Sequence, residues 1–220
     1  MSAKILISGQ SNSGKTTLLS SLKDVLVISH DGKSYPFPQP HVNVASFGSS
    51  AELIKLISEK IHAYKAKFGA IPKTLAIDSV SKIFDTLMDN CNTKYTGFNV
   101  YSNLNKEIHE FTDFIQNSVI ASGMNVVLIS HAIWDADTAQ FNLVGKGDFG
   151  KRGGFLSEVD HSVFVETKNN KRIIHHRSTR FPARTTLADL PDSQPIEEYT
   201  LQKHVDILTQ LRDQVADYEL

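Results

Sequence analysis

The chain has 220 residues, of which 40% are hydrophobic, enough to bury one sizeable core. Its 23 lysines and arginines nearly balance its 24 aspartates and glutamates, and the net charge of -1 excludes a general attraction to nucleic acid or acidic membranes. Any contact with nucleic acid would therefore need a local basic patch. The single cysteine, Cys91, excludes an internal disulfide, and such a composition fits a reducing compartment.

The first predicted elements form a strand-helix-strand unit. Residues 4–8 are a short apolar run, residues 16–22 have a helical pattern, and residues 25–29 are apolar and β-branched. This order predicts the start of a parallel sheet. Three prolines between residues 31 and 41 predict a loop, and residues 42–47 predict a further extended piece.

Helices and strands keep alternating through the middle of the chain. Apolar residues recur every three or four positions in residues 53–64 and 104–119, which predicts two amphipathic helices. Residues 74–77 and 126–130 are apolar runs typical of buried strands. Residues 145–154 hold five glycines and three basic residues, so we expect a flexible segment that cannot fill a core.

The last third predicts a hairpin and a final helix. Strands at residues 161–167 and 172–176 are expected to pair across Asn169-Asn170, because asparagine tolerates the positive φ of such turns. After a proline-bounded breaker, residues 196–218 have a helical apolar pattern.

Together these elements predict an α/β fold, with a mostly parallel twisted sheet flanked by helices and a C-terminal β-hairpin and helix. We expect a main domain at residues 1–190 and a helical appendage at residues 191–220. No stretch approaches the roughly 20 apolar residues needed to span a bilayer, so we expect a cytoplasmic protein with no membrane partner.

A phosphate-binding loop follows the first predicted strand. Residues 9–16 match G-x-x-x-x-G-K-[ST], whose glycines let backbone N–H groups face phosphates while the lysine reaches the β and γ oxygens. The threonine hydroxyl is expected to bind Mg²⁺. The predicted cofactors are therefore ATP and Mg²⁺, and the residues expected to bind them are Gly9, Gln10, Ser11, Asn12, Ser13, Gly14, Lys15, Thr16 and Thr17. We also expect the Lys15 side chain to be exposed.

Asp78 ends the apolar strand at residues 74–77. A Mg-ATP site needs such a carboxylate to hold the water shell of the metal opposite Thr16. We therefore predict that Asp78 is a metal and catalytic residue, with a simple helix cap as the alternative.

The sequence around Asp78 carries a family resemblance. LAIDSV at residues 75–80 resembles the Walker B strand of RecA recombinases, some 60 residues after the P-loop. The chain most resembles the phage-encoded RecA-core ATPases of single-strand annealing recombination, over roughly residues 3–187. Further markers are VVLISHA at residues 126–132, the glycine-rich basic stretch and STRFPART at residues 178–185. The resemblance implies a RecA-like P-loop core and, for a phage protein, the host cytoplasm.

The resemblance also implies two further catalytic residues. His131 is similar to the polar residue that senses the γ-phosphate in this family, and a locally satisfied histidine is the alternative. Asp31 takes the place of the carboxylate, usually glutamate, that orients the attacking water. The shorter side chain and the adjacent His30 depart from the pattern, so a turn-forming role for Asp31 stays open.

RecA-like recombinases place a DNA-contacting loop where this chain has its glycine-rich segment. The resemblance implies that Lys146, Lys151 and Arg152 bind the phosphates of single-stranded DNA, with Phe149 and Phe155 stacking on bases. The alternative is a solvated linker with incidental charge. A single-strand DNA-binding protein is a further candidate partner.

Arg180 resembles the arginine that ring-forming relatives supply to the γ-phosphate of a neighbouring subunit. Ser178 stands where a lysine is usual, and Arg184 is the second candidate for this role. An arginine acting across an interface would require a homo-oligomer, either a ring or a filament. A plain surface charge is the alternative.

The P-loop predicts an ATPase, and the resemblance implies an ATP-dependent protein of recombination or annealing that binds single-stranded DNA and has DNA-stimulated ATPase activity. One alternative is a small P-loop kinase, which would need an acceptor pocket and an arginine-rich lid. Another is a nucleotide-gated loader or regulator of replication proteins with weak ATPase activity, which the departures at Asp31 favour. We expect no zinc site, because no C-x-x-C or H-x-x-x-H spacing is present.

Overall fold

A computed structural model describes residues 2–32 and 34–216 of the chain. Its strands form one nine-stranded sheet in the order β3-β2-β4-β5-β1-β7-β8-β9, with β6 paired to β5 outside this path. Pairing is parallel from β3 through to β7 and antiparallel for β6, β8 and β9. The strands are β1 (Lys4–Gly9), β2 (Val25–Ser29), β3 (His41–Asn43), β4 (Thr74–Asp78), β5 (Asn125–Asp135), β6 (Gln140–Leu143), β7 (His161–Lys168), β8 (Lys171–His175) and β9 (Ser193–Pro195).

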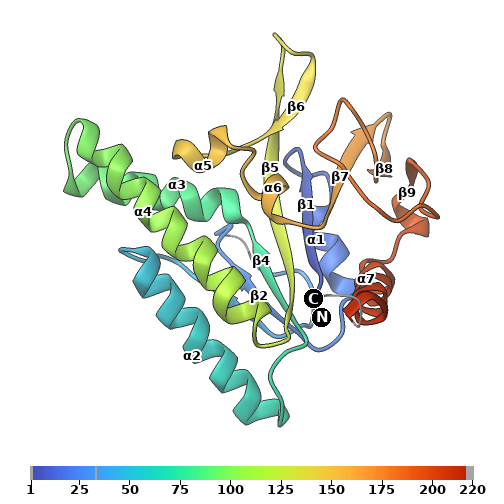
Figure 1. Cartoon of the computed structure of the whole chain (residues 1–220), viewed down its shortest axis with the longest axis horizontal. Coiled ribbons are helices and arrows are strands. Elements are labelled where there is room, and N and C mark those ends of the chain that lie inside the picture. The colour runs from blue at the N-terminus through green and yellow to red at the C-terminus, as the bar shows by residue number, and fades with distance from the viewer. Residues whose placement is uncertain (1, 33, 217–220) are drawn as a thin grey trace.

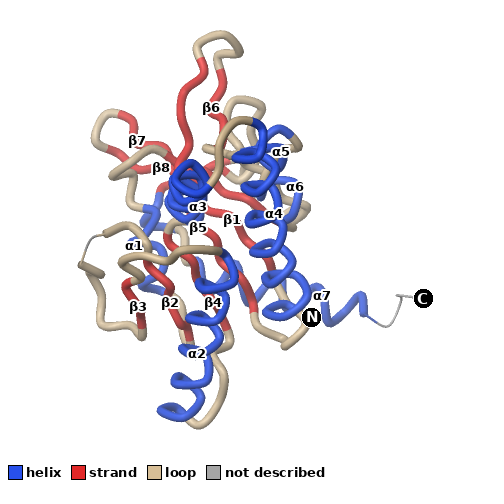
Figure 2. The backbone as a smooth tube through the Cα atoms, turned by 90° about the vertical axis from the view of Figure 1, so that its left-hand side faces the viewer, coloured by secondary structure: helices blue, strands red, loops and turns tan. Residues whose placement is uncertain are grey.

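Helices cover both faces of the sheet, as Figures 1 and 2 show. One face packs against α2 (Ser50–Phe68), α3 (Val80–Lys94) and α4 (Phe98–Phe114), which continues into a π-helical turn (Ile115–Ile120). The other face packs against α1 (Lys15–Leu18), its 3₁₀ continuation (Leu19–Ser21) and α7 (Leu201–Ala216), which follows a 3₁₀ turn (Ile196–Glu198). The predicted fold, a mostly parallel sheet flanked by helices with a C-terminal hairpin and helix, is confirmed.

The central strands are buried on both faces because their side chains alternate between two apolar cores. In β1, Leu6 packs on the α2-α3-α4 side, whereas Ile5 and Ile7 pack on the α1-α7 side. All three side chains are fully buried. This explains why the strands read in the sequence as continuous apolar runs.

Local signals explain where the helices begin and end. The side chain of Ser49 accepts a hydrogen bond from the backbone N–H of Glu52 at the start of α2. Gly69 closes the same helix with φ +83°, a left-handed conformation that glycine adopts without steric cost. The helix buries Leu53 and Ile57 against the sheet.

The register of the parallel strands brings their carboxyl ends to one edge of the sheet. Gly9 of β1 lies opposite His131 of β5, and Asp78 of β4 lies opposite both Ile129 of β5 and Ser29 of β2. Open α/β sheets bind ligands at this edge. The P-loop and Asp78 therefore meet at the same place in the fold.

Strand β5 is longer than the predicted strand at residues 126–130. It continues to Asp135 and pairs with β6, which sequence patterning did not predict. This β5-β6 hairpin projects from the body of the molecule in Figures 1 and 2. Ile133 and Trp134 are 59% and 43% exposed on it.

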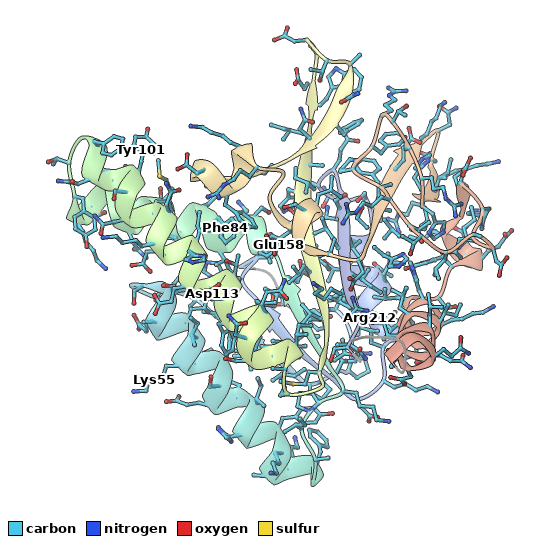
Figure 3. The ribbon with its side chains drawn as sticks, viewed as in Figure 1. Lys55, Phe84, Tyr101, Asp113, Glu158 and Arg212 are labelled. Carbon is cyan, nitrogen blue, oxygen red and sulfur yellow. The ribbon has the colours of Figure 1, made fainter. Side chains whose placement is uncertain are left out.

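The expectation of a flexible segment at residues 145–154 was wrong. Residues Gly147–Lys151 form α5, and Phe155–Glu158 form α6. Phe155 is 5% exposed and stacks on Phe84 of α3, which Figure 3 labels, while Phe149 contacts both rings edge to face. Two aromatic anchors thus hold the glycine-rich segment on the apolar core.

The hairpin β7-β8 is confirmed, with Asn169 and Asn170 at φ +50° and +59°. At the C-terminus, β9 extends the sheet and α7 buries Leu201 and Val205 against the α1 face. The predicted helix at residues 196–218 begins later, and its last two residues lie outside the described ones. The domain boundary at residue 190 stays a prediction. Within the described residues, no helix is long and apolar enough to cross a membrane.

Three histidines are buried together under α7. His161, His176 and His204 are each at most 3% exposed, and the ring of His204 lies 5.6 Å from that of His161 and 5.8 Å from that of His176. Tyr199 bonds His204 Nδ1, while both ring nitrogens of His176 have no hydrogen-bond partner among the described residues. No group of three or more His, Cys, Asp or Glu side chains in the described chain is arranged to hold a metal ion.

This histidine cluster predicts a fold that loses stability in mild acid. Burial lowers the pKa of His161 and His176 to about 4 and that of His204 to about 3, against about 6.5 in an unfolded chain. Because the unfolded chain then binds more protons, stability is complete above pH 6.5 and falls as the pH decreases toward 4. Each imidazole contributes about 1.4 kcal/mol per pH unit.

Chemical denaturation at pH 7.0, 6.0 and 5.0 measures this slope. The variant His176→Leu should flatten it, whereas His62→Gln, at an exposed position on α2, should keep the wild-type slope. An identical pH dependence in wild type and His176→Leu would contradict the prediction.

Candidate nucleotide-binding site

The P-loop connects β1 to α1, and its glycines are required by the fold around them. A Cβ on Gly9 would lie 2.6 Å from the carbonyl oxygen of Val165 on β7 and 2.9 Å from Ser13 Oγ. Gly14 has φ +97°, a conformation that other residues rarely adopt. The first glycine of the motif is thus required by the close approach of the β7 backbone, and the second by its left-handed backbone conformation.

Lys15 lies inside the loop. Its ammonium group donates to the carbonyl oxygens of Gly9 at 2.9 Å and Gln10 at 2.6 Å, and the residue is only 5% exposed. The expectation that this side chain would be exposed was wrong, because the loop carbonyls hold the charge inside the turn. The side chain remains beside the pocket that the loop encloses.

Thr16 and Asp78 meet across the end of β5. The Thr16 hydroxyl donates to Asp78 Oδ2 at 2.6 Å, although the two residues are 62 positions apart. Asp78 is 4% exposed, and the Asp78–Ser79 peptide bond is cis. The pairing places the two predicted metal-binding oxygens side by side.

Two serines that follow β4 connect it to His131 within β5. Ser79 and Ser81 share a hydrogen bond of 3.0 Å between their hydroxyl groups, and Ser81 Oγ accepts from the backbone N–H of His131 at 3.2 Å. The predicted strand ended at residue 130, just before His131, but β5 continues to Asp135, so His131 lies within the strand. The side chain lines the pocket beside Asp78.

A pocket of about 410 Å³ opens over the P-loop, within the size range of small-molecule sites. It brings seven of the nine predicted phosphate-binding residues, all but Gly9 and Gln10, together with Asp31, Asp78 and His131, which come from three neighbouring strands or the loops after them. Its described lining residues are Ser11, Asn12, Ser13, Gly14, Lys15, Thr16, Thr17, Ser29, Asp31, Ser34, Tyr35, Pro36, Asp78, His131 and Arg172.

Asp31 lines this pocket, whereas the adjacent His30 turns away from it. His30 bonds the carbonyl oxygen of Val44 and the hydroxyl of Thr86, so both its ring nitrogens are engaged in the core. Burial, with a smaller contribution from the charge of Asp78, raises the pKa of Tyr35 in the same pocket. Tyr35 therefore acts as a neutral hydroxyl there.

Arg180 and Arg184 do not line the pocket of their own chain. The Arg180 guanidinium lies over Trp134, 5.0 Å from the ring centre, and beside a second pocket under the β5-β6 hairpin. Arg184 donates to the carbonyl oxygen of Val159 and pairs with Ser162 through the backbone. Arg184 thus has a structural role in the described fold.

The predicted DNA-binding cations lie on and beside α5. Lys146 pairs with Asp85 of α3 at 3.0 Å, and Lys151 pairs with Asp148 at 3.6 Å. Arg152 is exposed at the end of the helix. Carboxylates therefore balance part of the positive charge. The predicted stacking of Phe155 on bases was wrong, because this side chain is buried.

Sequence patterns did not indicate Arg172 or Tyr35 as site residues. Arg172 follows the Asn-Asn turn that predicted the hairpin, but nothing in the sequence tells that β7 lies beside β1. Tyr35 lies in a proline-rich loop without periodicity. Both residues reach the pocket through tertiary structure alone.

The fold and the site define a P-loop ATPase of the α/β class. The chain matches the family model described as AAA domain over residues 1–187, and it belongs to this family. No curated protein matches the chain in sequence. The resemblance to P-loop ATPases is confirmed at this level, and ATP with Mg²⁺ is the general cofactor pair of such domains.

The described residues fit these cofactors. Hydroxyl and carboxylate oxygens are the ligands that Mg²⁺ prefers, and Thr16 and Asp78 present both at one point of the pocket. Gly14 lines the pocket without a side chain, which leaves the backbone there open to phosphates. Bound Mg²⁺ would supply the charge that neutralises the phosphate oxygens.

The Thr16–Asp78 pair predicts that Asp78→Asn weakens nucleotide binding in the presence of Mg²⁺, because an amide holds the water shell of the metal less strongly than a carboxylate. The affinity for ATP, titrated at several Mg²⁺ concentrations, measures the effect. Asp89→Asn, on the exposed side of α3, removes the same charge away from the pocket and should leave the titration unchanged. Equal curves for both variants would contradict the role of Asp78.

Proposed function

We propose that this protein binds and hydrolyses ATP with Mg²⁺ at the P-loop pocket. The observation that carries the proposal is the contact between the Thr16 hydroxyl and the Asp78 carboxylate, in a pocket that Lys15 also lines. Triphosphate recognition needs all three groups in one place. The AAA domain match favours an ATPase over a small P-loop kinase.

Each residue has a defined part in this proposal. Lys15 exchanges its two carbonyl partners for phosphate oxygens, to which its ammonium group donates more strongly because the acceptor is charged. Asp31 and His131 lie at the same pocket, where a carboxylate orients a water molecule and an imidazole bonds the terminal phosphate. The site thus has candidates for binding, water activation and sensing.

The variant Lys15→Ala should therefore abolish ATP hydrolysis, because it removes the donor to the β and γ oxygens. Phosphate release under saturating ATP measures this loss. Since Lys15 is buried, circular dichroism and thermal unfolding must show that the variant folds; Lys23→Ala, at an exposed position beyond α1, is the control. Near wild-type turnover in a folded Lys15→Ala protein would refute the ATPase proposal.

We further propose that single-stranded DNA is the polymer partner, in homologous recombination or strand annealing. The resemblance to RecA-core ATPases motivates this proposal. In support, β5 runs parallel to β1 and extends beyond the P-loop edge, so that the hairpin and α5 follow on the side of the nucleotide pocket. Lys146, Lys151 and Arg152 form the candidate phosphate contacts.

A ring or filament of identical chains belongs to the same proposal. Arg180 is exposed and does not line the nucleotide pocket of its own chain, which is compatible with an arginine supplied to a neighbouring subunit. Light scattering with and without ATP tests assembly, and a monomer under both conditions would overturn this part.

Replacing Lys146, Lys151 and Arg152 together by alanine should weaken binding to single-stranded DNA. For three lost phosphate contacts, the slope of log affinity against log salt should shrink by about 2. Fluorescence anisotropy at several salt concentrations measures both quantities. The matched control is a triple alanine variant of Lys55, Lys60 and Lys65 on α2, which removes the same charge; Lys55 points away from the body of the molecule in Figure 3.

The ATPase rate with and without single-stranded DNA completes this experiment. Stimulation that is lost in the α5 variant and kept in the α2 variant supports the recombination proposal. A low rate that DNA does not change favours the nucleotide-gated loader or regulator of replication proteins. Unchanged DNA affinity in the α5 variant would leave α5 as a structural connection only.

A further inference from the structure

Arg172 lies on β8, which runs antiparallel to β7, and β7 in turn lies beside β1, the strand before the P-loop. Arg172 is the second residue of β8, pairs with Thr167 of β7 and shares a face with Ile174, two positions later. Ile174 is fully buried in the core on the α1 face. The side chain of Arg172 is therefore on the face of the sheet from which α1 and the P-loop rise.

The guanidinium group of Arg172 lies across Gly14. A Cβ on Gly14 would be 3.2 Å from Arg172 Nη1 and 3.3 Å from both Cδ and Cζ. The arginine thus approaches the loop at the glycine before Lys15, where a side chain would displace it. The same residue lines the pocket of about 410 Å³ together with Thr16 and Asp78.

The charges of the pocket leave Arg172 available for a ligand. Among the described residues, no carboxylate is within ion-pair distance of its guanidinium, and no acceptor takes a hydrogen bond from it. Lys15, which also lines the pocket, already donates to two loop carbonyls. A planar guanidinium with five donors matches pairs of phosphate oxygens.

We propose that Arg172 binds the phosphate chain of the nucleotide held by the P-loop of its own chain. This inference rests on the proposed function and adds a residue that the P-loop motif does not contain. It differs from an arginine supplied by a neighbouring subunit, because the contact is completed within one chain. The β7-β8 hairpin thereby becomes part of the nucleotide site.

Binding of ATP and of inorganic tripolyphosphate, measured by calorimetry in Mg²⁺ buffer, tests this inference. Arg172→Ala should bind both ligands about 10- to 100-fold more weakly, as expected for the loss of a hydrogen bond to a charged group. Arg172→Lys should recover part of the affinity, since it keeps the charge but not the paired donors. Lys171→Ala removes the same charge from the opposite face of β8 and should bind as wild type.

The possible outcomes separate the inference from the proposed function. If wild type binds ATP and Arg172→Ala binds it within twofold, the inference fails and the proposed function stands. A loss for ATP alone, or a wild type that binds ATP but not tripolyphosphate, contradicts a phosphate contact and also overturns it. A wild type that binds neither ligand removes both proposals. Arg172→Gln replaces the alanine variant if thermal unfolding shows that alanine impairs folding.

Discussion

The position of β5 between β1 and β4 is the constraint on which the site depends. Because the three strands are parallel, the P-loop after β1 and Asp78 at the end of β4 lie at the same edge of the sheet, with β5 between them. Thr16 spans this distance and reaches Asp78 with a 2.6 Å hydrogen bond. Between them, β5 continues past this edge, and its residue His131 lines the pocket.

The C-terminal half of the chain completes the site from the other side of β1. The carbonyl oxygen of Val165 on β7 lies so close to Gly9 that no side chain fits there. The side chain of Arg172 on β8 also lies close to Gly14, but at a longer distance. Two of the motif glycines are thus matched to residues more than 150 positions away. The P-loop conformation is therefore a property of the whole sheet, not of the local sequence alone.

These contacts explain what the sequence predicts and what it misses. The P-loop, the strand before Asp78 and the hairpin turn at Asn169 follow local rules of spacing and backbone conformation, and the structure contains all three. Strand order is not encoded locally, so the approach of Arg172 could not be inferred. Glycine-rich composition favoured a flexible segment, but Phe149 within it and Phe155 just after it pack against Phe84 and each other, and this apolar contact offsets the conformational cost of the glycines.

The packing of that segment also changes what a DNA contact there would require. Phe149 packs against Phe84, and Lys146 is paired with Asp85, so a DNA contact by Lys146 would replace this ion pair. An exposed ion pair contributes only about 0–1 kcal/mol, so replacing it by a contact with a phosphate changes the interaction free energy little. The favourable free energy would then come mainly from counterions released by the DNA. Such binding is weak at high salt and insensitive to base sequence, which is the behaviour that a protein acting on any single strand needs.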